Sequence, residues 1–228
     1  MKFNIYLWIT LIAVTTESAE SASEPTSYSV TFSTYALRVL ETENLYYADA
    51  PGSLTKLEFR KKSRSDHYQA TLQKADGTLR MYRRNGPSAK KMSAILVGQI
   101  RIDPTDVPLL LLITPGNDRT VNTINAYAID DSQSNFPTGS IRLVNLAGVD
   151  VLGRIGSEQI TLGNGGISQA YHTESQQFLD ISIAAKGNNR YHLLYKKNIR
   201  VASGSRSLLI LTPPARKGSI RIGGHLLL

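Results

Sequence analysis

Short apolar runs separated by turn residues dominate the chain beyond Tyr28. The runs are rich in Val, Ile, Leu, Tyr and Thr, and they recur at intervals of about ten residues, the spacing expected of successive strands. No segment carries its apolar residues at helical spacing. This pattern is typical of a β-sandwich or a β-barrel, so the sequence predicts an all-β fold.

Two stretches of the chain, about one hundred residues apart, have matching patterns, as expected of an internal repeat. Three pairs of segments match in order: Leu37–Leu40 with Ile141–Val144, Ile100–Ile102 with Ile199–Val201, and Leu109–Pro115 with Leu208–Pro213. The members of the last pair are nearly continuous apolar runs, which predicts strands buried on both faces at the centre of their sheets. The alternative is a chance match between strand-rich stretches. The expected boundary is the polar, turn-rich linker at residues 130–139.

Two hairpins are expected within these halves. Asp76-Gly77 joins Tyr68–Lys74 to Thr78–Arg84, because Asp-Gly readily adopts the positive φ values of a type I′ turn. The polar face of that hairpin would then carry Arg80, Tyr82 and Arg84. A second hairpin joins Ile181–Ala185 to Tyr191–Val201 through Gly187-Asn188-Asn189.

Residues 1–21 are expected to form a cleaved signal peptide. Lys2 provides a positive start, Phe3–Val14 is an apolar stretch too short to span a bilayer, and small residues follow at Thr16–Ser18 or Ala19–Ser21. The alternative is an uncleaved N-terminal anchor. The chain has no cysteine, which excludes disulfides, Cys-ligated zinc and thiol catalysis. A secreted chain of this size without disulfides favours the periplasm or the cell surface of a bacterium.

The second half also resembles a known class of domain. Gly139–Asn145 contains Ile-Arg-Leu-Val-Asn and is followed by Val149–Val151, a Gly-containing turn and Tyr191–Pro213. This order resembles the immunoglobulin-like β-sandwich domains of unknown function in exported bacterial proteins. The resemblance covers Gly139 to Pro213 and reaches the first half only through the repeat. It implies two tandem immunoglobulin-like modules, at residues 28–131 and 137–228, and it brings no catalytic motif.

No motif for catalysis or cofactor binding stands out. The four histidines form no His-Glu-x-x-His or similar ligand set, and Gly-x-Ser-x-Gly is absent. We therefore expect no cofactor, no metal and no catalytic residue, and we favour a non-enzymatic protein. The competing hypothesis is a secreted carbohydrate-active hydrolase whose acids converge from different strands, around Asp150, His172 or Asp180.

The net charge of +8 conceals four regions of alternating sign. Residues 1–55 carry −4 and residues 92–180 carry −5, whereas residues 56–91 carry +8 and residues 181–228 carry +9. These basic segments indicate a surface for an anionic partner. The candidate binding residues are Arg60, Lys61, Lys62, Arg80, Tyr82, Arg84, Lys196 and Arg200. The alternative is that they form solvated faces that keep a strand-rich surface soluble.

The expected partner is anionic material of the bacterial envelope, such as acidic polysaccharide or the phosphates of lipopolysaccharide. Nucleic acid is a poor candidate, because export separates the protein from it and no RNP-like or OB-like aromatic pattern accompanies the charge. Two alternatives involve proteins: self-association of basic with acidic segments, and a surface-assembly subunit that donates or accepts an edge strand. No apolar stretch approaches twenty residues, so the cleaved chain is not expected to span a membrane.

Overall fold

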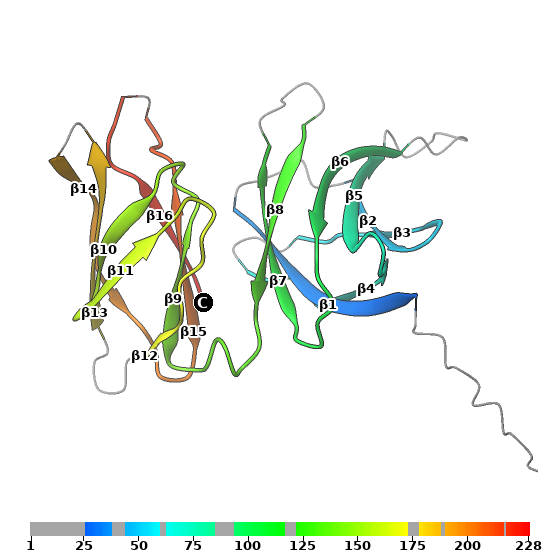
Figure 1. Ribbon diagram of the computed structural model, residues 1–228, viewed down its shortest axis with the longest axis horizontal. Coiled ribbons are helices and arrows are strands. Elements are labelled where there is room, and N and C mark those ends of the chain that lie inside the picture. Colours follow the sequence, from blue (N-terminus) through cyan, green and yellow to red (C-terminus); the bar gives the residue numbers. More distant parts are fainter. Residues whose placement is uncertain are drawn as a thin grey trace, which may run out of the picture.

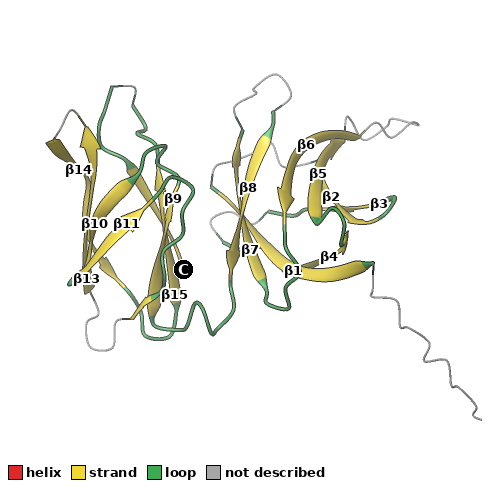
Figure 2. Ribbon diagram, in the orientation of Figure 1, coloured by secondary structure: helices red, strands yellow, loops and turns green. Residues whose placement is uncertain are grey.

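The computed structural model describes residues 26–37, 44–59, 63–84, 94–116, 122–172, 178–187, 190–216 and 218–228. Every regular element in these ranges is a β-strand (Figure 2), which confirms the all-β prediction. None of these ranges holds a helix long and apolar enough to cross a membrane. The strands are β1 (Ser27–Ala36), β2 (Leu45–Ala50), β3 (Ser53–Lys56), β4 (Tyr68–Gln73), β5 (Thr78–Arg84), β6 (Ala94–Arg101), β7 (Leu109–Pro115), β8 (Ile124–Asp130), β9 (Ser140–Asn145), β10 (Val151–Ile155), β11 (Glu158–Leu162), β12 (Tyr171–His172), β13 (Phe178–Gly187), β14 (Arg190–Arg200), β15 (Arg206–Thr212) and β16 (Gly223–Leu227).

The first eight strands form two four-stranded sheets around one core. Their orders are β4-β1-β7-β8 and β3-β2-β5-β6. Both sheets contribute to the first core, which includes Phe32, Tyr47, Leu79 and Leu111. The rings of Phe32 and Tyr47 meet edge to face across this core, with centroids 5.2 Å apart, a favourable geometry for two aromatic rings.

The last eight strands repeat this arrangement. The sheets β12-β9-β15-β16 and β11-β10-β13-β14 have the same orders, strand for strand, as those of the first half. In each half the first strand pairs in parallel with the seventh, β1 with β7 and β9 with β15. The second core includes Leu143, Ile181 and Leu209.

The two halves pack against each other through their inner sheets, β4-β1-β7-β8 and β12-β9-β15-β16, so that four sheets stack side by side (Figure 1). Leu110 and Leu112 of β7 meet Leu208 and Ile210 of β15 in a third apolar cluster, the interface core. All four side chains are fully buried, with 0 % exposure. Each such side chain contributes about 1.5–3 kcal/mol of burial free energy, so the halves are held as one packed body.

The stack explains the two continuous apolar runs. In β7, Leu109, Leu111 and Ile113 point into the first core while the residues between them point into the interface core. Strand β15 divides in the same way between the second core and the interface core. Both strands are central in their sheets. The prediction of central strands buried on both faces is confirmed.

Residues 130–139 form an anchored junction. The segment is turn-rich, as expected, but Asp131, Ser132 and Phe136 are buried. Arg64 of the first half lies 2.6 Å from the Asp131 carboxylate, and Arg206 of the second half lies 3.3 Å from it. The segment is therefore fixed between the halves by burial and by charge, which the expectation of a polar linker did not include.

The expected hairpin at Asp76-Gly77 is wrong. Strand β4 pairs with β1 in the inner sheet, whereas β5 pairs with β2 and β6 in the other sheet of the first half, β3-β2-β5-β6. Gly77 has a φ of 60°, and its N–H donates to the carbonyl of Gln73 (2.7 Å) in a turn that passes from one sheet to the other. The reason is burial, because Leu72 and Leu79 both enter the first core, from opposite sheets.

The second expected hairpin is confirmed. Strands β13 and β14 pair antiparallel from Gly187 with Arg190 to Phe178 with Arg200, and a register shift lies at Ile183/Ala184. Two residues of the connecting turn, 188 and 189, lie outside the described ranges.

The sequence match between Leu37–Leu40 and Ile141–Val144 is out of register. The strand of the first half that occupies the place of β9 is β1, and its residues Phe32–Ala36 pair in parallel with β7. Leu37 lies just beyond β1, and residues 38–40 lie outside the described ranges. Signal peptide residues 1–21 also lie outside them.

A buried serine recurs at the same place in the two halves. The Ser65 hydroxyl oxygen accepts from the Thr34 N–H (2.8 Å), and Ser168 does the same for Leu143 (2.8 Å). Both hydroxyls donate to the carbonyl of the following residue, at 2.7 Å. Each serine lies three residues before a tyrosine, in Ser65-Asp66-His67-Tyr68 and Ser168-Gln169-Ala170-Tyr171. This Ser-x-x-Tyr match is a signal of similarity that the apolar patterns did not reveal.

Candidate functional site

The predicted anion-binding residues fall into three groups. Arg60, Lys61 and Lys62 lie outside the described ranges. Arg80, Tyr82 and Arg84 lie on β5, and Lys196 and Arg200 lie on β14. Strands β5 and β14 belong to the two outer sheets, β3-β2-β5-β6 and β11-β10-β13-β14, which form opposite ends of the stack (Figure 1). The structure therefore places these residues on two separate faces.

The basic face of the first half is already engaged by its own neighbours. Strand alternation puts Arg80, Tyr82 and Arg84 on the same side of β5, as the sequence predicted, although the strand partners differ. Arg80 lies 2.7 Å from the Asp76 carboxylate. The Arg84 guanidinium stacks on the Tyr46 ring, 4.4 Å from its centroid, in a cation–π contact.

The outer face of the second half carries basic side chains of a different kind. We use the name outer face for the side of sheet β11-β10-β13-β14 turned away from the second core. Strand register places on it four cations and one carboxylate: Arg154, Lys186, Lys196, Arg200 and Asp180. None of these five residues has an ion pair among the described residues, and all five are exposed. Unlike Arg80, the outer-face cations are open to an external anion.

Large apolar side chains share the outer face. Phe178 pairs across the strands with Arg200, Tyr191 with Lys186, and Leu193 with Ala184. Phe178 is 53 % exposed, Tyr191 63 % and Leu193 54 %. Tyr191 and Leu193 lie close together on β14, whereas Phe178 lies at the other end of β13. Exposed apolar residues beside charge, as at Tyr191 and Leu193, are typical of an interaction surface rather than of a surface that is merely solvated.

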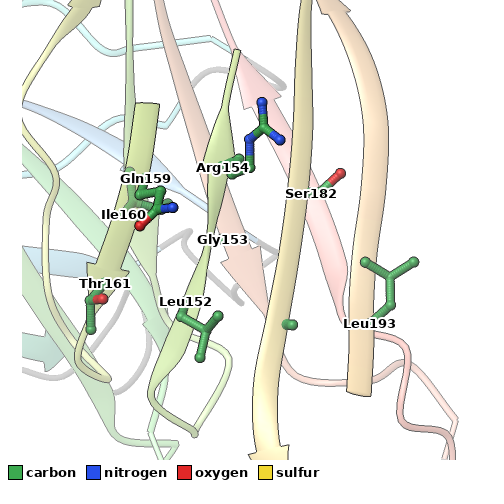
Figure 3. Close-up of a pocket in the computed structure, with 9 residues that line it drawn as sticks. Leu152, Gly153, Arg154, Gln159, Ile160, Thr161, Ser182 and Leu193 are labelled. Carbon is green, nitrogen blue, oxygen red and sulfur yellow. The ribbon is translucent and has the colours of Figure 1, made fainter. Parts of the chain in front are cut away.

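A shallow hollow of about 440 Å³ lies within the outer face (Figure 3). Its floor is low because β13 contributes the small side chains of Ser182 and Ala184 there. Leu152 and Arg154 of β10 and Leu193 of β14 flank these small residues. Gln159 and Thr161 of β11 complete a lining of mixed polar and apolar character. The hollow can receive a partner that offers both anionic and apolar groups.

A second, more polar pocket of about 350 Å³ lies beside the junction. Its lining combines a carboxylate, a guanidinium, an imidazole and two amides: Asp130, Ser134, Asn135, Pro137, Arg142, Gln169, Ala170 and His172. Sequence reasoning did not single out Arg142. The available signal was a lone arginine inside the apolar run Ile141–Val144, where a charged side chain needs dedicated partners.

Two ionisable groups of this junction pocket have shifted pKa values. Burial raises the pKa of Asp130, but hydrogen bonds from Ser132 and Asn135 outweigh it and hold the pKa below its usual value. Burial lowers the pKa of Arg142, and the nearby Asp130 and Asp131 carboxylates oppose that shift. An Asp130 with a lowered pKa is suited to stay ionised rather than to act as a general acid.

The acids and the histidine of the hydrolase hypothesis do not converge. Asp150 accepts from the Asn164 N–H (2.9 Å) in the loop before β10, His172 lies on the inner-sheet strand β12, and Asp180 lies on the outer face. Within the described ranges, no three His, Asp or Glu side chains form a group that could hold a metal ion. A catalytic role based on these three residues lacks the shared pocket that it requires.

None of the protein-family models searched matches this chain. No curated protein matches it either.

Proposed function

We propose that this protein is a non-enzymatic, exported binding protein of a bacterial envelope, and that its outer face binds a phosphate-bearing amphiphile of the lipopolysaccharide kind. The observation that carries the proposal is the composition of that face. Four exposed cations without ion-pair partners among the described residues, Arg154, Lys186, Lys196 and Arg200, share that face with exposed Phe178, Tyr191 and Leu193.

The chemistry of the two kinds of side chain is complementary to such a partner. Phosphate groups pair well with Lys and Arg, whose contacts are stronger when the ions are partly desolvated. The aromatic and aliphatic groups beside them remove apolar surface from water when acyl chains cover them. A purely hydrophilic acidic polysaccharide would use the cations but would leave the apolar side chains exposed.

We also propose that the two halves are tandem immunoglobulin-like modules, at residues 28–131 and 137–228, that arose by duplication. Their identical strand orders and the recurring contacts of Ser65 and Ser168 support this. In this proposal the first module supports the second, because the inner sheets pack together and leave the outer face of the second module free.

Vesicle flotation tests the proposed binding. The full chain lacking residues 1–21 is mixed with neutral phosphatidylcholine vesicles and with the same vesicles containing lipopolysaccharide. We expect binding to the lipopolysaccharide vesicles alone, and a decrease of at least about tenfold when the salt concentration is raised from about 0.05 M to about 0.5 M, because salt screens exposed charges.

Two double variants compare the two basic faces. K196Q/R200Q removes two outer-face cations and should weaken binding by about tenfold or more. R80Q/R84Q removes the same charge from the first half and should leave binding within about twofold, because these arginines are engaged by Asp76 and Tyr46. Equal loss in both variants, or equal binding to neutral vesicles, would contradict the proposal. Binding to soluble acidic polysaccharide without vesicle binding would identify the other anionic partner instead.

A further inference from the structure

The junction pocket holds the half-buried guanidinium of Arg142, which forms no ion pair with the described residues, although the Asp130 and Asp131 carboxylates lie near it. Arg142 projects from β9 on the side that faces the first half, the same side as Val144 of the interface core. Its Nε donates to the Ser168 carbonyl and its Nη1 to the Asp130 carbonyl, both at 2.9 Å. Its guanidinium lies 5.8 Å from the centroid of the Phe136 ring. These contacts fix the orientation of the guanidinium.

The fixed guanidinium keeps donors available. Two carbonyl contacts use two of the five N–H groups of an arginine, and in the described part of the chain Nη2 has no hydrogen-bond partner and Arg142 no ion pair. The neighbouring Asp131 carboxylate is engaged by Arg64 and Arg206. The Asp130 carboxylate is engaged by Ser132 and Asn135. An anion entering the pocket would therefore not have to displace a protein carboxylate from Arg142.

The rest of the lining offers groups that recognise hydroxyls. The side chains of Ser134, Asn135 and Gln169 each contain both a donor and an acceptor, and the exposed His172 lies on the neighbouring strand β12. Gln169 is held toward Glu158 by a 3.4 Å contact of its amide nitrogen. A volume of about 350 Å³ is near the lower limit for small-molecule pockets, which favours a ligand no larger than one sugar unit.

We propose that the junction pocket binds a single carboxylated polyol, of the uronic acid class, with the carboxylate on Arg142 and the hydroxyls on the side chains of Asn135, Gln169 and His172. A planar carboxylate matches the fork of the guanidinium and can form two parallel hydrogen bonds with it. The outer face and the junction pocket share no residue, so each site is tested separately.

Sodium galacturonate, galactose and sodium acetate are suitable probes for the full chain lacking residues 1–21. We expect galacturonate to bind with a Kd in the millimolar range and to shift the backbone amide NMR signals of Asn135, Arg142 and Gln169. Galactose lacks the carboxylate and acetate lacks the hydroxyls, so each should bind at least about tenfold more weakly.

Variants assign the binding to the pocket. Replacing Arg142 would also remove its hydrogen bonds to two backbone carbonyls, so the main variants are Q169A and H172A, whose side chains are exposed. Each should weaken galacturonate binding by about threefold to tenfold, which is the loss of one hydrogen bond. R142K should weaken it further, since lysine keeps the charge but loses the fork. R101Q is the control, because Arg101 is exposed on β6, pairs with Asp103 and belongs to neither proposed site; it should bind like the unaltered protein.

Three outcomes would overturn the proposal. One is no signal shift with galacturonate up to about 50 mM, where a millimolar site would be saturated. Another is that galactose binds as well as galacturonate, which would show that the Arg142 charge has no role in binding. The third is that acetate binds as well as galacturonate, which would show that the hydroxyls are not recognised. Thermal unfolding of every variant distinguishes lost binding from lost folding.

Discussion

Arg206 and Asp131 meet across the junction between the two halves. The Arg206 Nη1 donates to the Asp131 backbone carbonyl at 2.6 Å and lies 3.3 Å from the Asp131 carboxylate. The Asp131 side chain is only 7 % exposed, and Arg64 of the first half pairs with the same carboxylate at 2.6 Å. One buried carboxylate therefore holds an arginine from each half, beside the apolar interface core.

Replacing Asp131 should destabilise the whole protein. D131A leaves Arg64 and Arg206 partly buried without their shared partner, and removing one member of such a pair costs about 3–5 kcal/mol. Urea-induced unfolding measures this change. The matched control is D103A, because Asp103 is 89 % exposed and pairs with Arg101 at 3.8 Å. That variant should lose less than about 1 kcal/mol, and a similar loss in both would contradict the role of the junction.

The two buried serines should be equivalent in their contribution to stability. S65A and S168A each remove the acceptor of a buried backbone N–H, that of Thr34 or of Leu143. Each should lower the free energy of unfolding by about 1–3 kcal/mol. S203A, in an exposed turn, should change it by less than about 0.5 kcal/mol. Hydrogen exchange of the Thr34 and Leu143 amides should rise only in the corresponding variant, and unchanged exchange would count against the contact.

Gly153 should be intolerant of any side chain. A Cβ there would lie 2.1 Å from the Ser182 carbonyl oxygen and 2.9 Å from the Ile183 Cδ1, so β10 and β13 would have to separate. G153A should therefore cost about 3 kcal/mol or more. The control G204A meets no atom within 4 Å and has no positive φ. Circular dichroism melts of the two variants should differ clearly, and matching melts would refute the close approach.

The acid stability of the junction should depend on Asn135. Because the folded pKa of Asp130 is lower than its ordinary value, ionised Asp130 contributes stability above that ordinary value, and the contribution disappears as the pH falls through the folded pKa. N135A removes one hydrogen bond to the Asp130 carboxylate and should raise its pKa. NMR titration of the Asp130 carboxyl carbon measures the shift.

A second prediction for N135A concerns its stability. N135A should be less stable than the unaltered protein at pH 7, and this difference should become smaller as the pH falls through the folded pKa of Asp130 and the carboxylate becomes protonated. S134A is the control, because Ser134 lines the same pocket but gives the Asp130 carboxylate no hydrogen bond among those of the described residues. An unchanged Asp130 titration in N135A would contradict the assigned contact.

The sequence alone predicted the all-β class, the hairpin between β13 and β14, and the central places of Leu109–Pro115 and Leu208–Pro213. These are properties of local pattern, because strand alternation and continuous apolar runs report how many faces of a strand are buried. The pattern also placed Arg80, Tyr82 and Arg84 on one side of β5, which depends only on the period of two.

Only the tertiary structure decided which strands pair and where the charges lie. Asp76-Gly77 has the local chemistry of a hairpin, yet burial of Leu72 and Leu79 from opposite sheets sends β4 and β5 to different partners. Asp130, Arg142 and His172 line one pocket because the chain returns to the junction along separate strands. Contacts of this kind depend on packing between segments far apart in the chain. A local sequence pattern does not show which distant residues that packing brings together.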